Sequence, residues 1–87
     1  MTEEIILQNL ENLLQEMSIE LRYEKGQFAG GFYRYKDKKE IVINKDLSAQ
    51  RKITILANEL KGKIDLNNRY LAPALREIIE NAGDMGN

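Results

Sequence analysis

One segment of this chain has the residue spacing of a zinc-peptidase helix. Residues 56–62 read LANELKG, so that Glu59 follows Asn58 and Gly62 comes four residues after Asn58. In a zinc peptidase, histidines at the positions of Asn58 and Gly62 bind the metal, and the glutamate acts as the general base. This chain contains no histidine and no cysteine, and Asn58 offers only a neutral amide. We therefore predict that the chain binds no metal, needs no cofactor and is not an enzyme.

Hydrophobic periodicity predicts the elements that must position this segment. Apolar residues recur at helical spacing in three stretches and alternate with polar residues, or run together, in three shorter ones. The order is α-β-β-β-α-α, which favours an α+β fold with a small three-stranded sheet and helices packed on one face. The helices are expected over 3–18, from 46–48 to 62 and over 73–82, and the strands over 19–24, 32–35 and 40–44.

Capping and turn residues refine these limits. Thr2 is the expected N-cap of the first helix, and Ser48 or Asp46 that of the second. Gly62 is a typical C-terminal stop, and Pro73 fits the first turn of the third helix, where its missing N–H costs nothing. The polar turn after residue 35 predicts a hairpin between the second and third strands. The continuous apolar run in the third strand predicts a central position, or cover on both faces.

Composition is that of one folded domain. The chain has 87 residues, of which 43% are hydrophobic and 31% are charged, as in globular rather than disordered proteins. We expect residues 1–83 to form a single α+β domain and residues 84–87 to be a disordered tail. The acidic start has no signal-peptide pattern, and no stretch has the ~20 apolar residues that span a bilayer. We therefore expect a soluble cytoplasmic protein.

The order of elements and the residues before the helical segment resemble a known family. Residues 41–44 read IVIN, residues 46–48 read DLS, Arg51 follows, and residues 56–60 read LANEL. Over roughly residues 19–62, this pattern resembles the minimal zincin core of the ImmA/IrrE-type metallopeptidase domain. The resemblance implies a zincin-like scaffold without zinc ligands, with Asn58, Glu59 and Gly62 as a degenerate site. It also implies an acidic third ligand on the next helix, for which the sequence offers Asp65, Glu77 and Glu80 without deciding among them.

A second candidate surface is the predicted hairpin, which interleaves aromatic and basic residues. Such a pattern can stack on bases and neutralise phosphates, but it also solubilises a sheet edge. The isoelectric point of about 5.5 is unlike that of most nucleic-acid-binding domains, which exceeds about 9. The candidate residues are Tyr33, Arg34, Tyr35, Lys36, Lys38 and Lys39.

Two functional hypotheses follow from the uneven charge. Residues 1–33 hold six acids and two bases, residues 34–63 four acids and nine bases, and residues 64–87 four acids and two bases. The first hypothesis is a protein-interaction module, whose basic middle meets an acidic partner or the acidic ends of a second copy. The alternative is a nucleic-acid-associated regulatory protein that uses the basic aromatic hairpin 32–39. No membrane and no metal are expected as partners.

Overall fold

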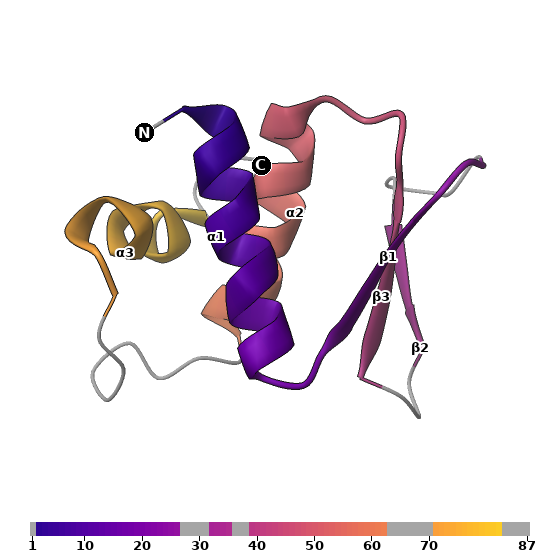
Figure 1. The fold of residues 1–87 in the computed structure, drawn as a ribbon, viewed down its shortest axis with the longest axis horizontal. Helices are drawn as coiled ribbons and strands as arrows, with labels where there is room; N and C mark the ends of the chain where they lie inside the picture. The colour runs from indigo at the N-terminus through magenta and orange to yellow at the C-terminus, as the bar shows by residue number, and fades with distance from the viewer. Residues whose placement is uncertain (1, 27–31, 36–38, 63–70, 83–87) are drawn as a thin grey trace.

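A computed structural model of the chain describes residues 2–26, 32–35, 39–62 and 71–82. It is an α+β fold, which confirms the predicted class (Figure 1). Three helices surround a small core and cover one side of a sheet. In chain order the elements are α1 (Glu3–Glu16), β1 (Glu20–Glu24), β2 (Phe32–Tyr35), β3 (Glu40–Asn44), α2 (Ala49–Lys61) and α3 (Pro73–Glu80).

The sheet has the strand order β1-β3-β2. β1 pairs in parallel with β3, with Leu21 beside Ile41, and β2 pairs antiparallel with the other edge of β3, with Tyr33 beside Val42. β3 is therefore the central strand. Its three apolar residues 41–43 are all buried, as is typical of a strand with neighbours along both edges. β1 and β2 are the edge strands.

Side-chain caps begin two of the helices. The Thr2 hydroxyl accepts a hydrogen bond from the backbone N–H of Ile5 at 3.3 Å, and the Ser48 hydroxyl accepts one from Arg51 N–H at 3.1 Å. Both satisfy N–H groups that the first helical turn leaves without an intrahelical partner. α3 has no side-chain cap and instead begins at Pro73, whose fixed φ suits the first helical position.

α1 ends two residues before the predicted limit at residue 18. Ser18 adopts a φ of 61°, in the left-handed region, and its N–H donates to the carbonyl of Gln15 at 3.0 Å. The next N–H, of Ile19, reaches back to the carbonyl of Leu14 at 2.9 Å. This pair of bonds is a Schellman motif, which stops a helix and turns the chain. It leads α1 directly into β1.

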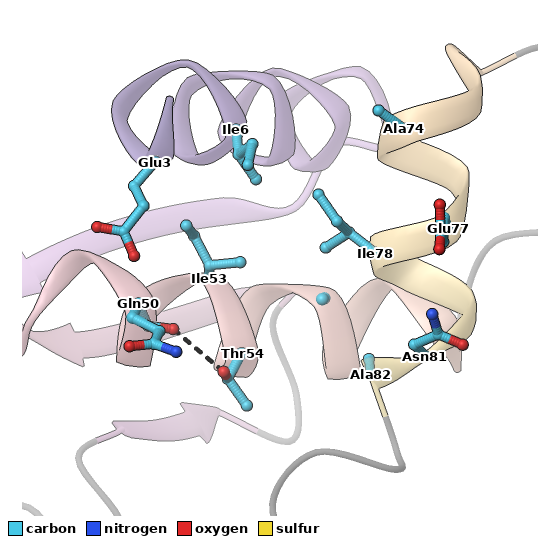
Figure 2. A pocket seen from close by; sticks show the side chains of 11 residues that line it. Glu3, Ile6, Gln50, Ile53, Thr54, Ala74, Glu77, Ile78, Asn81 and Ala82 are labelled. Carbon is cyan, nitrogen blue, oxygen red and sulfur yellow. Dashed lines mark hydrogen bonds between the residues drawn. The ribbon is translucent and has the colours of Figure 1, made fainter. Parts of the chain in front are cut away.

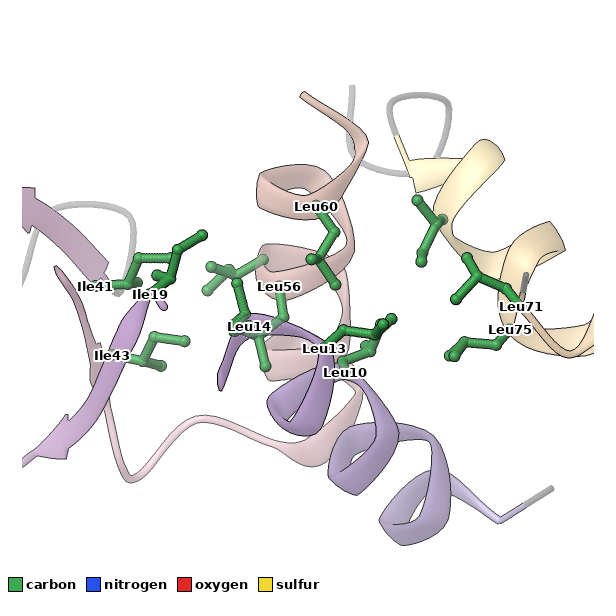
Figure 3. Close-up of a cluster of buried hydrophobic side chains, with 12 residues drawn as sticks. Leu10, Leu13, Leu14, Ile19, Ile41, Ile43, Leu56, Leu60, Leu71 and Leu75 are labelled. Carbon is green, nitrogen blue, oxygen red and sulfur yellow. The ribbon is translucent and has the colours of Figure 1, made fainter. Parts of the chain in front are cut away.

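The hydrophobic core lies between the sheet and the helices. In the fold as a whole, α1 and α2 form the middle layer. α3 packs on the far side of these two helices from the sheet (Figure 1). All three helices thus lie on one side of the sheet, but α3 forms an outer layer and does not pack on the sheet itself. Figure 3 shows the buried cluster that joins the layers. Its residues are Leu10, Leu13, Leu14, Ile19, Ile41, Ile43, Ile55, Leu56, Leu60, Leu71, Leu75 and Ile79.

The last described helix is shorter than the sequence predicts. α3 ends at Glu80, with Asn81 as its C-cap, two residues before the predicted end at residue 82. The predicted tail 84–87 lies outside the described residues. Among the helices that the structure describes, none has the length and apolar character needed to cross a membrane.

Candidate functional site

The three candidate residues on α2 do not share one open site. Asn58 is exposed, whereas Glu59 is only 8% exposed and lies on the helix face that packs into the protein. Gly62 is the C-cap of α2, as predicted, with φ −81° and ψ −11°. These angles suit any residue, and a Cβ at Gly62 would approach only the Glu59 carbonyl oxygen, at 3.9 Å. Neither the backbone angles nor the space around this position therefore requires glycine.

These positions do not fit a zinc ion. Zinc sites take imidazole, thiolate or carboxylate ligands, and the donor set here is one exposed amide, one buried carboxylate and no side chain at Gly62. Within residues 2–26, 32–35, 39–62 and 71–82, no three histidine, cysteine, aspartate or glutamate side chains are grouped so that they could hold a metal. We derive no metal chemistry from this helix.

The basic hairpin is described only in part. The backbone of β2 places Tyr33, Arg34 and Tyr35 on an edge strand beside β3. Lys39 precedes β3 and is exposed. Lys36 and Lys38, and the side chains of the three β2 residues, lie outside what the structure describes. The nucleic-acid hypothesis therefore gains no contact or geometry from the described residues.

The structure brings together a different site, a groove where α1, α2 and α3 meet. We call it the helix groove; its volume is about 420 Å³. Figure 2 shows Ile6 of α1, Ile53 of α2 and Ile78 of α3 pointing toward one another across it. Its lining among the described residues is Glu3, Ile6, Gln50, Ile53, Thr54, Ala57, Ala74, Glu77, Ile78, Asn81 and Ala82.

The helix groove has an apolar floor and an acidic rim. The three isoleucines are each partly exposed, and Glu3 and Glu77 at the rim are exposed. Within the part of the chain that the structure describes, no lysine or arginine lines the groove. The Thr54 hydroxyl donates to the Gln50 carbonyl oxygen at 3.1 Å (Figure 2), so this polar group is satisfied within α2. The groove therefore presents apolar surface and negative charge to a ligand.

Helical periodicity places Ile6, Ile53 and Ile78 on the apolar faces of the three predicted helices, but it does not predict the groove between them. Periodicity identifies which face of a helix is apolar, but it does not show whether a neighbouring helix covers that face completely. The available signal was the short side chains of Ala57, Ala74 and Ala82, which leave room between helices. Unless the angles at which the helices cross are known, alanines in a helix do not indicate a groove.

A polar cluster ties α1, β1 and α2 together away from this groove. The Tyr23 hydroxyl donates to a Glu11 carboxylate oxygen at 2.5 Å, and the Lys52 ammonium lies 5.0 Å from the centre of the Tyr23 ring. Burial raises the pKa of Tyr23 well above its ordinary value, and the hydrogen bond to Glu11 and the charge of Glu11 raise it further. The phenol is therefore held in its neutral, proton-donating form.

Replacing Tyr23 with phenylalanine tests this cluster. We expect the free energy of unfolding to fall by about 1–2 kcal/mol, because Glu11 loses a donor in a partly buried position. The raised pKa means that the folded state keeps the proton more tightly than the unfolded chain, so this contribution is complete below about pH 10 and is lost above it. Urea denaturation at about pH 8 and pH 11 should show the difference between wild type and Y23F shrinking at the higher pH. A difference that grows there would contradict the assignment.

Comparison with known proteins adds no relative. No protein-family model matches the chain, and no curated protein and no solved structure is significantly similar to it.

Proposed function

We propose that the chain is a non-catalytic protein-interaction module that binds an amphipathic helix of a partner protein in the helix groove. The observation that carries this proposal is the convergence of Ile6, Ile53 and Ile78 from three helices on one open space of about 420 Å³. Helix-in-groove recognition places apolar side chains at helical spacing into such a space. When a partner helix fills the groove, the partly exposed isoleucines become buried, and this burial of apolar surface favours binding.

The acidic rim of the helix groove favours a partner helix with positive charge. Glu3 and Glu77 are exposed lining residues, and no cationic side chain is among the described residues that line the groove. A partner helix with lysine or arginine beside its apolar stripe would meet these carboxylates, and an acidic helix would be repelled. A single helix in this groove would bury less surface area than a standard protein interface does. The complex is therefore expected to be weak or transient.

The resemblance to a zincin core enters this proposal as a scaffold without activity. The order of α1, β1, the β2–β3 hairpin and α2 supports it, as does the donor set at Asn58, Glu59 and Gly62, which fits no zinc ion. On this account the ancestral reaction is absent, and the function is carried by a surface remote from the degenerate positions. None of those three residues lines the helix groove.

A matched pair of charge reversals at the start of α1 tests the proposal. The probe is a synthetic amphipathic helix with leucines on one face and lysines beside them, and its affinity is measured by fluorescence anisotropy. We expect Glu3→Lys to weaken binding by about fivefold, because an attractive rim charge becomes a repulsive one. Glu4→Lys should change affinity by less than about twofold. Glu4 is also exposed in the first turn but does not line the groove.

The pair separates a local contact from a general charge effect. Both variants change net charge equally and place a lysine at the positive end of the same helix dipole. Equal weakening by the two would show that only the overall charge matters. Absence of any binding by the wild-type chain at low salt, where charge attraction is strongest, would refute the proposal.

A further inference from the structure

β1 is an edge strand with one open side. The sheet order is β1-β3-β2, so β3 pairs with only one edge of β1, and no other described strand pairs with it. The ladder to β3 is anchored at both ends: Glu20 N–H donates to the Lys39 carbonyl at 2.7 Å, and Lys45 N–H donates to the Glu24 carbonyl at 3.0 Å.

These two bonds determine which backbone groups face outward. In a parallel pair, the N–H and C=O of one residue face the partner strand, and those of the next residue face away from it. The backbone groups of Glu20 and Glu24 face β3, so those of Arg22, which lies midway between them, face β3 as well. The N–H and C=O groups of Leu21 and Tyr23 therefore face the open edge. They form two donor–acceptor pairs at the spacing that an added strand requires.

A second groove runs along this edge between α1 and β1, and we call it the edge groove. Its volume is about 390 Å³. From α1 it is lined by Glu11 and by amide side chains that include Asn12, and from β1 by Glu20, Leu21 and Tyr23. The helix thus forms a wall beside the strand edge, an arrangement in which an extended peptide can pair with the strand and rest its side chains on the helix. The two grooves share no lining residue.

The two faces of β1 specify alternate side chains of such a peptide. Leu21 and Tyr23 pack toward the core and α1, so apolar peptide residues on that face lie beside these two side chains, next to the polar wall that α1 forms. On the other face, Arg22 is occupied by ion pairs with Glu24 and Glu40, the latter at 2.9 Å. Glu20 is exposed on this face as well, so β1 itself presents two carboxylates there, Glu20 and Glu24, beside one cation, Arg22. Cationic side chains fit this second set of positions.

We propose that the open edge of β1 binds an extended peptide that alternates apolar residues with lysine or arginine, as a fourth strand of the sheet. A second copy of this chain fits the edge less well. Antiparallel pairing of two β1 strands through Leu21 and Tyr23 would set Arg22 against its own copy and Glu20 against Glu24. Like charges directly opposite one another destabilise strand pairing. This site is independent of the helix groove.

Amide hydrogen exchange, followed by NMR on the full chain, tests the proposal. In the free protein, the amides of Leu21 and Tyr23 should exchange faster than those of Arg22 and Glu24, which bond to β3. The probe is a short synthetic peptide of alternating lysine and valine. Its addition should slow exchange at Leu21 and Tyr23 by about tenfold or more. A peptide of alternating glutamate and valine serves as the charge control and should have no effect.

Two N-methylated probes show whether backbone pairing is responsible. In an added strand, only alternate N–H groups of the peptide face β1, so methylation of one alternate set should abolish protection and methylation of the other should not. Equal effects of the two probes, or no slowing at Leu21 and Tyr23, would overturn the proposal. Protection that rises with protein concentration in the absence of peptide would instead identify a second copy as the occupant and overturn the peptide assignment. Loss of binding in the helix groove would leave these results unchanged.

Discussion

Leu56→Ala is expected to lower the free energy of unfolding by about 2–5 kcal/mol, the range found when a fully buried leucine is truncated and its cavity stays open. Leu56 is 0% exposed and lies in the cluster that joins α1, α2 and the sheet (Figure 3). A single domain of this size has a total stability of only about 5–15 kcal/mol. Urea denaturation, monitored by circular dichroism, gives the change from the shift in midpoint at constant slope.

Asn58→Ala is the matched control for this core variant. Asn58 lies two residues further along α2 and is exposed, and alanine has the higher helix propensity. We expect the stability to change by no more than about 0.5 kcal/mol. A loss at Asn58 as large as that at Leu56 would mean that the candidate degenerate site has a structural role that its exposure does not indicate.

Ala74→Trp is expected to weaken binding of the amphipathic helical probe by about tenfold or more. Ala74 is exposed at the start of α3 and lines the helix groove, so an indole ring would occupy the space meant for the partner's apolar side chains. A tenfold loss corresponds to about 1.4 kcal/mol, which is well within the contribution of one buried anchor residue. Fluorescence anisotropy or calorimetry with the same peptide measures it.

Glu80→Trp controls for the introduction of a tryptophan on the same helix. Glu80 is exposed, is not a described lining residue of the helix groove and pairs with Arg76 on its own helix, at 2.7 Å. Its replacement should leave affinity within about twofold, since an exposed pair of this kind contributes little. Tighter binding by Ala74→Trp would show that the partner does not enter the groove. Thermal unfolding of both variants confirms that the fold is retained.

Local signals in the sequence predicted most of the element limits. The Thr2 and Ser48 caps and Pro73 each act within one helical turn, and the structure has each at its predicted place. Gly62 also lies at the predicted end of α2, although its angles do not require glycine. Such signals depend on backbone groups a few residues away, which a sequence displays directly. The end of α1 was missed because a left-handed Ser18, rather than a glycine, stops it. A sequence does not show that a serine will adopt a left-handed conformation, because glycine is the residue typical of it.

Features that depend on contacts between distant elements could not be predicted in this way. The parallel pairing of β1 with β3 brings together strands that are not consecutive, and the placement of α3 as an outer layer depends on which helix face remains uncovered. Glu59 is another example, because a glutamate is expected at the surface but lies on the buried face of α2. Both grooves arise between elements, so neither has a sequence motif.

Chemical-shift mapping of the isotopically labelled chain with the amphipathic helical peptide tests the central proposal most directly. The account predicts saturable shifts at the amides of Ile6, Ile53 and Ile78, and unchanged positions for the amides of Asn58 and Leu21. That pattern would locate the partner between the three helices. Shifts centred on Leu21 and Tyr23, or on Asn58, or no shifts at any peptide concentration, would contradict the assignment of the helix groove as the binding site.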